Sequence, residues 1–499
     1  MKRTWTALAL AGAMVFQLAA CGASNSGGGS SSANSGTESA LVLSDQSVTL
    51  DGNTISEGTD GAVTVSHDIV YYQAGQGEDY GAGSADDEHT AEEAGAHTVV
   101  TIRKAGTYRV SGSLSAGQLA VDLGDDAKTA PSSVVTLILD GVDITCTVAP
   151  AVIFYNVYEC DADFVAYDNE ETDNYVSSPT VDTSAAGANV ILADGSVNNI
   201  SGSYVARIYK EGTTKKLHKY DGAFYSKMSM NIGGESEGDG VLNITGENEG
   251  LDTELHLTIN GGNVYTMANQ ASPDGGLDAD EDILINGGYV VAVGIRNDPI
   301  SDDSAQQYIQ LTFASVLPAG SQIALTDDSG DQLLSFTLEK SAQSIVFSSP
   351  DLKQDVDYTL TVDGVTQQYT GTSAGGMGPG NGGQPPELPD GQQPGDGSQP
   401  GQDGQQPPQS DGQQPPEKPD GSQAPNTNGQ QPPEKPDGDS APQDRPQPPE
   451  NGGQAPDGQA PGTQPGQNQT QDSQTEPSTQ FTLTGDHHAF SGISDSENG

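Results

Sequence analysis

Short apolar and alternating runs fill the chain between residues 40 and 300, and Gly, Asn and Asp turns separate them. The runs at 99–102, 134–139 and 190–192 are rich in Val, Ile and Leu, which is the composition of β-strands. We find no stretch with the period of an amphipathic helix. A few more strand-like runs follow in residues 301–372. The pattern predicts an all-β protein.

An internal repeat is the most informative pattern. The block that starts at Gly250 recurs 26 residues later at Gly276, and a looser copy that starts at Ala223 precedes the first block by 27 residues. A fixed period of this length, made of strands and Gly turns, fits coils that stack ~4.8 Å apart in a parallel β-helix. A β-sandwich would not need a fixed period. The sequence therefore predicts a parallel β-helix over residues 41–300, followed by a small β-rich part, residues 301–373.

Beyond this folded part the composition changes. Residues 374–475 consist of Pro, Gly, Gln and Asp repeats, and one ten-residue phrase occurs unchanged at Gly412 and at Gly429. This segment has almost no apolar residues with which to bury a core. We expect a long disordered tail that acts as an extended spacer and contacts the cell wall. A short terminal tail, residues 476–499, follows it.

The start of the chain is typical of an exported lipoprotein. A charged beginning precedes an apolar run from Trp5 to Ala20, and the run ends in Leu-Ala-Ala before Cys21. The run is too short for a good transmembrane span. These features predict a signal peptide over residues 1–20, a lipid on Cys21 and a flexible Gly/Ser tether over residues 21–40. We expect the protein to lie on the extracellular face of the cell membrane, held by the lipid.

Charge and cysteine content narrow the partners. The formal net charge is −52, which disfavours nucleic acid because a polyanion would be repelled. It favours cations, or anions bridged by a divalent metal, although an acidic surface also serves solubility. Cys146 and Cys160 either pair outside the cell or remain free thiols. Trp5 is the only Trp, so a sugar-stacking surface in the mature chain must use Tyr or Phe.

Five groups of short motifs occur in order along residues 95–295. They are Thr101–Tyr108 with Ser111-Gly112, Leu137–Ile144, Leu192–Gly195 with Asn199-Ile200, Ala223–Lys227, and the Gly-Leu and Asn-Gly-Gly motifs of the repeat. With these motifs the sequence resembles bacterial carbohydrate-binding domain proteins built as right-handed parallel β-helices, similar in shape to pectate lyases. The resemblance implies non-catalytic binding of acidic or cellulosic polysaccharide, with bound Ca²⁺. The sequence departs from the family pattern in two insertions, at about residues 160–188 and 206–222.

Independently of this resemblance, the repeat stacks carboxylates. Asp252 lies under Asp278 and Glu254 under Asp280, each pair ~4.8 Å apart by strand spacing. Two like charges at that distance repel by roughly 1 kcal/mol in water, and by more near a protein surface. Calcium is the natural counterion because it binds six to eight oxygens; the alternative is that these turns are simply solvated. The candidate calcium ligands are Glu249, Asp252, Glu254, Asp274, Asp278, Asp280 and Asp282.

The repeat also predicts an apolar, aromatic strip that faces outward. On the strand after the Asn-Gly-Gly turn, Asn263, Tyr265 and Met267 lie over Tyr289, Val291 and Val293. A sugar ring stacks on such a strip through its C–H face, unless residues 301–372 cover it. The candidate carbohydrate-binding residues are Tyr265, Tyr289, Asn263, Tyr225 and Tyr220.

Enzymatic activity is the less favoured prediction. A lyase of this shape needs a Lys or Arg base beside Ca²⁺, and the basic residues available are Arg207, Lys210, Lys215, Lys216, Lys219 and Lys227. We expect a non-enzymatic lipoprotein that binds polysaccharide with Ca²⁺. The alternatives are a calcium-dependent polysaccharide lyase and a structural surface or adhesion protein.

Overall fold

The computed structural model describes residues 38–77, 79–161, 181–213, 215–234, 237–270, 272, 274–373, 473–484 and 488–496. Cys21, the proposed signal peptide and nearly all of the Pro-rich segment lie outside these residues. Within the described residues one α-helix, α1 (Ala91–Gly95), accompanies 31 strands, so the all-β prediction is confirmed. No helix of the described part is long and apolar enough to cross a membrane.

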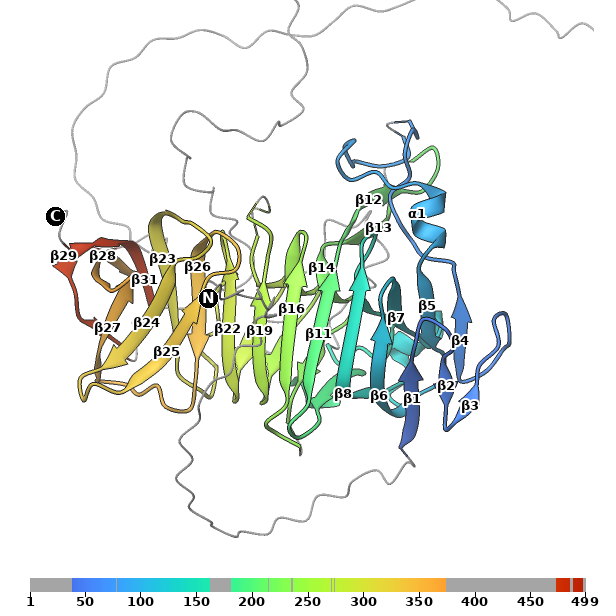
Figure 1. Cartoon of the computed structure of the whole chain (residues 1–499), viewed down its shortest axis with the longest axis horizontal. Helices are drawn as coiled ribbons and strands as arrows, with labels where there is room; N and C mark the ends of the chain where they lie inside the picture. The colour runs from blue at the N-terminus through green and yellow to red at the C-terminus, as the bar shows by residue number, and fades with distance from the viewer. Residues whose placement is uncertain are drawn as a thin grey trace, which may run out of the picture. The chain divides into compact units, whose positions relative to one another are not determined.

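Three ladders of parallel strands organise most of the chain, and the strands of the second ladder lie side by side across the middle of Figure 1. The first ladder contains β10 (Ala188–Leu192), β15 (Met230–Ile232), β18 (Leu257–Ile259) and β21 (Ile283–Ile285). The second ladder contains β11 (Val197–Gly202), β16 (Val241–Gly246), β19 (Asn263–Met267) and β22 (Tyr289–Gly294). The third ladder contains β5 (Thr98–Ile102), β7 (Gly117–Asp122), β9 (Val152–Asn156), β14 (Gly222–Ser226), β17 (Glu249–Thr253) and β20 (Leu277–Ala279).

The remaining elements of the N-terminal half attach to these ladders. The long strand β8 (Val135–Cys146) pairs in parallel with β10 and β11 and with β6 (Gly106–Leu114), which in turn pairs with β1 (Ser39–Leu43). The short elements are β2 (Thr49–Leu50), β3 (Asn53–Thr54), β4 (Val63–Ser66) and the 3₁₀ turns Asp125–Thr129 and Thr183–Ala185. Cys146 and Cys160 are free thiols, which resolves the alternative left open by the sequence.

The registers predicted from the repeat are confirmed. Leu257 pairs with Ile283, and Ile259 pairs with Ile285, and all four side chains are buried. Apolar side chains at alternate positions are thus stacked into one core, as the two-residue period of a strand requires. The looser copy joins the same ladder, because Met230 pairs with Leu257.

The turn after each copy is shaped by glycine. Gly262 and Gly288 adopt φ angles of +85° and +91°, which favour residues without a Cβ. A Cβ on Gly288 would lie 2.5 Å from the carbonyl oxygen of Gly262 in the preceding repeat copy. The asparagines of the turns also stack, since the Asn286 side chain donates to Asn260 Oδ1 at 3.1 Å. The Asn-Gly-Gly motif therefore lets successive turns approach closely.

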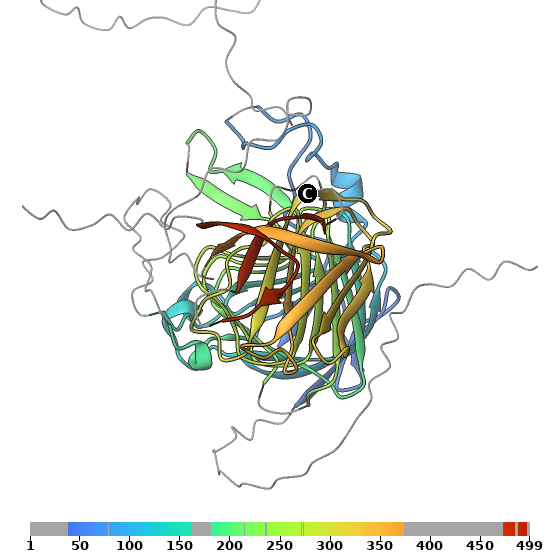
Figure 2. The same ribbon diagram turned by 90° about the vertical axis from the view of Figure 1, so that its left-hand side faces the viewer.

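The pairing changes from parallel to antiparallel after β22. Strand β22 pairs with β26 (Ala342–Ser348), which pairs with β23 (Tyr308–Leu317), and a second hydrophobic core forms there. The other strands of this C-terminal part are β24 (Gln322–Asp327), β25 (Gln332–Thr337), β27 (Asp357–Val362), β28 (Val365–Ser373), β29 (Ser473–Ser478), β30 (Phe481–Thr482) and β31 (Ala489–Asp495). Figure 2 shows these orange and red strands in front of the parallel ladders.

The terminal tail that the sequence sets apart is part of this second core. Strand β31 pairs with β23 and β28, and β30 pairs with β27. Phe481 and Phe490 are buried and their rings contact each other. The described residues of 476–499 thus complete the fold of residues 301–373, from which the Pro-rich segment separates them in sequence.

Candidate functional site

The acidic residues of the repeat lie on the third ladder and beside it. Tyr225, Asp252 and Asp278 occupy equivalent positions on β14, β17 and β20, so the predicted stacking of the two aspartates is confirmed. Gly222 pairs with Glu249 on the neighbouring strand. A Cβ on Gly222 would lie 2.6 Å from the Asp252 Cβ, so the glycine makes room for this side chain.

Three carboxylates form the centre of the site. One oxygen from each of Glu249, Asp252 and Asp278 lies within 4.8 Å of the others. Glu249 and Asp252 are buried, with 2% and 6% of their surface exposed. Glu249 Oε2 and Glu254 Oε2 are also buried, and neither atom has a hydrogen-bond partner among the described residues. Buried oxygens without donors are costly, so this group is suited to a bound cation.

These carboxylates line a cavity of about 340 Å³. Its lining residues are Arg207, Lys216, Lys219, Asp221, Tyr225, Glu249, Asp252, Glu254, Asp274, Asp278, Asp280, Arg296 and Asp298. Six of the seven candidate metal ligands are therefore brought together. Asp282 does not line the cavity; its pKa is raised by burial and lowered by the nearby His256.

Sequence reasoning missed two carboxylates of the cavity. Asp221 immediately precedes β14, two residues before the start of the looser repeat copy at Ala223. Asp298 follows β22 and lies outside the repeat altogether. An alignment of the looser copy extended by two residues would have found Asp221, whereas no repeat signal marks Asp298.

Burial dominates the electrostatics of the cavity. It raises the pKa values of Glu249, Asp252 and Asp278 well above their ordinary range, and repulsion between the carboxylates adds to this effect. Burial likewise raises the pKa of Glu254 to about 7, although Lys216, Lys227 and a hydrogen bond from Tyr225 oppose the increase. The site therefore holds protons near neutral pH unless a cation replaces them.

Four cationic side chains line the same cavity, against eight carboxylates. Lys219 pairs with Asp221, Arg296 pairs with Asp274, and Lys216 Nζ lies 3.8 Å from Glu254 Oε1. These cations compensate only half of the formal negative charge of the lining. Lys219 also interacts electrostatically with Glu249 and Asp252.

The geometry fits calcium. Oxygens bound to one Ca²⁺ at 2.3–2.6 Å lie at most about 5 Å apart, and the three central oxygens meet this limit. All side-chain ligands on offer are oxygens, which suit a hard cation. The cavity has space for water or a ligand oxygen to complete the six to eight positions that Ca²⁺ requires.

Tyr220 and Tyr225 are structural neighbours of this cavity. Each is 1% exposed, so neither ring offers a face to a sugar. The Tyr225 hydroxyl donates to Glu254 and to the carbonyl of Lys219. Both rings pack against each other with their centroids 5.2 Å apart.

The Tyr265 and Tyr289 strip is half-buried under the C-terminal part. Both side chains pack against the second hydrophobic core, and the Tyr289 ring lies 5.2 Å from that of Phe347. The Tyr289 hydroxyl donates to the carbonyl of Leu333 at 3.1 Å. Asn263 donates its side-chain amide to backbone carbonyls rather than facing an open groove. The structure agrees with the alternative in which residues 301–372 cover this strip.

The basic insertion folds as a hairpin of β12 (Val205–Tyr209) and β13 (Lys216–Tyr220). It directs Arg207, Lys216 and Lys219 to the acidic cavity, whereas Lys210 and Lys215 do not line it. Lys227 acts electrostatically on Glu254. The basic residues of the sequence are therefore divided rather than gathered into one cluster.

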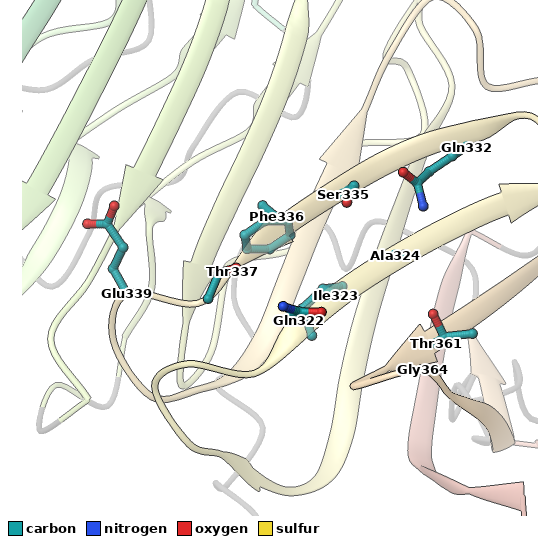
Figure 3. Close-up of a pocket in the computed structure, with 10 residues that line it drawn as sticks. All are labelled: Gln322, Ile323, Ala324, Gln332, Ser335, Phe336, Thr337, Glu339, Thr361 and Gly364. Atoms are coloured by element: carbon teal, nitrogen blue, oxygen red, sulfur yellow. The ribbon is translucent and has the colours of Figure 1, made fainter. Parts of the chain in front are cut away.

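A separate hollow of about 580 Å³ lies on β24 and β25 (Figure 3). Figure 3 shows Phe336 between Ser335 and Thr337 on β25, opposite Gln322 and Ile323 on β24. Glu339 is the one charged residue of its described lining, so this hollow lacks the carboxylate cluster of the acidic cavity.

Part of the chain matches a known protein family. Residues 96–313 match the model of a family described as carbohydrate-binding domain-containing protein. The similarity is to carbohydrate-binding proteins. The match confirms this part of the resemblance noted in the sequence, and it covers all three ladders from β5 to β22.

A solved structure with local likeness is the polysaccharide lyase-like protein from C. thermocellum, a gadolinium derivative. The two chains are 19% identical with a TM-score of 0.28, and the likeness covers 50% of this chain and 68% of the other. Among curated proteins, none matches the sequence.

Proposed function

We propose that the protein binds an acidic polysaccharide without cleaving it, and that Ca²⁺ held by Glu249, Asp252 and Asp278 bridges the protein to the glycan. The observation that carries this proposal is the group of three carboxylate oxygens within 4.8 Å of one another, two of which belong to the buried residues Glu249 and Asp252. The family match over residues 96–313 supports a carbohydrate as the partner.

The charge of the cavity explains why a metal is needed. The cavity is lined by eight carboxylates and only four cationic side chains. The carboxylate of a uronate would therefore be repelled. A bound Ca²⁺ would reverse the local charge and accept a glycan carboxylate among its oxygens. Calcium thus converts an anionic cavity into a site for an anionic sugar.

The three parallel ladders support a right-handed parallel β-helix as the scaffold of this site. In such a scaffold each coil contributes one residue at each equivalent position, so acidic turns accumulate as a column. The proposed anchor at Cys21, outside the described residues, would hold this scaffold at the extracellular face of the cell membrane. Replacing Cys21 by Ser should release the protein from membranes.

The test uses the full chain carrying Cys21→Ser and beads of insoluble polygalacturonate. We expect Ca²⁺-dependent retention that EDTA removes and that Asp252→Asn with Asp278→Asn abolishes. A matched control is Asp125→Asn with Asp126→Asn, which neutralises two exposed acids outside the cavity. Retention that survives both EDTA and the central double substitution would overturn the proposal.

A comparison with cellulose sharpens this test. If Ca²⁺ bridges to uronate, EDTA should weaken retention on polygalacturonate more than retention on cellulose. Equal sensitivity on the two materials would assign calcium to stabilisation of the fold alone.

A lyase is the second candidate because Lys216 and Lys219 line the cavity that would hold the metal. A general base must be unprotonated. Although burial lowers the pKa of Lys219, the neighbouring Asp221 raises it further, and the outcome is a raised pKa. Lys219 is therefore held as a cation, which favours binding over elimination. Appearance of unsaturated, ultraviolet-absorbing product from polygalacturonate would establish the lyase instead.

A further inference from the structure

A second groove, of about 590 Å³, lies on the other side of the β12–β13 hairpin, where residues 69–77, 79 and 80 face the hairpin. Its lining includes the half-exposed rings of Tyr71, Tyr80 and Tyr209 and the exposed side chain of Leu217. The groove shares no lining residue with the acidic cavity. In Figures 1 and 2 the green hairpin and the blue loop lie next to each other.

The hairpin serves both sites through neighbouring residues. Arg207 and Lys216 line the acidic cavity, whereas the next residues in the chain, Ile208 and Leu217, line the groove. Successive side chains of a regular strand point to opposite faces, which accounts for Lys216 and Leu217 on β13. On β12 the pairing shifts register at Ile208 and Tyr209, and both of these residues line the groove. A chain-like ligand that crosses the hairpin would meet both sites.

The wall of the groove is held in place by its backbone. The Ala82 N–H donates to the Arg207 carbonyl at 2.8 Å, and the Tyr209 N–H donates to the Tyr80 carbonyl at 2.7 Å. Between them lies Gly81, where a Cβ would meet the Arg207 oxygen at 2.2 Å. The loop therefore docks on β12 closely, and the Tyr80 and Tyr209 rings are positioned before any ligand binds. Such preorganisation reduces the entropy lost on binding.

We infer that this groove is a subsite for neutral sugar rings of a polysaccharide. The tyrosine rings offer apolar faces to sugar C–H groups, and the side chains of Gln73, Asp79 and His218 can hydrogen-bond to hydroxyls. Among the described lining residues none is Lys or Arg, and Asp79 is joined by a second carboxylate, Glu211. A uronate would find no Lys or Arg countercharge there, whereas an uncharged ring needs none.

This inference rests on the proposed function, since it assumes that the protein binds polysaccharide. It adds that the preferred glycan contains neutral sugars as well as acidic ones. The two sites would then bind different sugars of one chain. The affinity for a glycan that occupies both sites would exceed the affinity for a glycan that occupies either alone.

The test is calorimetric titration of the full chain carrying Cys21→Ser with cellohexaose, xylohexaose and mannohexaose. At least one should bind, and Tyr209→Ala should weaken it about 2- to 10-fold, the range expected for one aromatic contact. Tyr209 is the variant of choice because its ring is not packed against the hydrophobic core. Tyr209→Phe should retain binding, and Tyr158→Ala, a half-exposed tyrosine that lines neither site, should change nothing.

The outcome is separable from that of the calcium site. Binding of the neutral hexasaccharide should persist in EDTA and in Asp252→Asn with Asp278→Asn. If none of the three binds while polygalacturonate is still retained, the inference fails and the proposed function stands. If binding is unaffected by Tyr209→Ala but lost with Phe336→Ala, the neutral subsite is the hollow on β24 and β25 and the inference is wrong.

Discussion

Two surfaces are built from the same repeat, and they differ in what they contact. On the third ladder the repeat stacks Asp252 on Asp278 and leaves them beside a cavity. On the second ladder it stacks Tyr265 on Val291, next to Tyr289, and these side chains pack under the C-terminal part. The period determines which residues stack, but residues outside the repeat determine what each stack meets.

The difference shows how burial acts on unlike side chains. Apolar groups gain free energy when the C-terminal part covers them. Carboxylates lose free energy when they are buried close together, as the raised pKa values of Asp252 and Asp278 indicate. One surface thus stabilises the fold, whereas the other stores unfavourable electrostatic energy that a cation can release.

The largest expected effect concerns the covered surface. Phe347 is fully buried and its ring contacts Tyr289. Phe347→Ala should lower the free energy of unfolding by about 3–5 kcal/mol, the usual cost of removing a buried aromatic ring. Chemical denaturation in the presence of Ca²⁺ measures this change. A loss below 1 kcal/mol would mean that the C-terminal part does not depend on this core.

Without Ca²⁺, the acidic surface should make the folded protein less stable as pH rises. The pKa of Glu254 is about 7 in the folded protein, above its ordinary value of 4.5. Below both values the group is protonated in both states and has no effect. As pH rises from about 4.5 to 7 the unfolded chain loses the proton first, so stability falls by up to about 3 kcal/mol.

Thermal melts without Ca²⁺ should therefore show a higher melting temperature at pH 5 than at pH 8. Glu254→Gln should weaken this dependence without removing it, because the other carboxylates with raised pKa values still contribute. Saturating Ca²⁺ should reduce it too, because the metal competes with the protons. A calcium-free melting temperature that rises from pH 5 to pH 8 would contradict the electrostatic account of the cavity.

Removing the central carboxylates should separate metal binding from stability. In the unmutated protein, Ca²⁺ at about 100 times its Kd should stabilise the fold by about 2.7 kcal/mol. Asp252→Asn with Asp278→Asn should abolish this gain, yet raise stability without Ca²⁺ because the repulsion is removed. Loss of stability in the calcium-free variant would show that these carboxylates serve the fold directly.

The sequence predicted which residues of the repeat stack on one another, but it did not predict which residues outside the repeat lie beside them. Stacking depends on the period, so Leu257 over Ile283 and Asp252 over Asp278 follow from alignment of the repeat copies. Asp298 reaches the cavity from a segment beyond the repeat, and no local pattern signals it. The return of β31 to β23 joins strands on either side of the Pro-rich segment, which hydrophobic periodicity alone does not encode.

The smallest effect tests whether the covered strip has any part in glycan binding. Tyr265 is half-buried against the second core, so Tyr265→Ala should lower the free energy of unfolding by about 1–2 kcal/mol. Retention on polygalacturonate and on cellulose should remain unchanged, because the ring does not face an open groove. Denaturation and pull-down of the same preparation measure both quantities. If retention falls while stability holds, the strip itself contacts glycan, and the two surfaces of the repeat share one function.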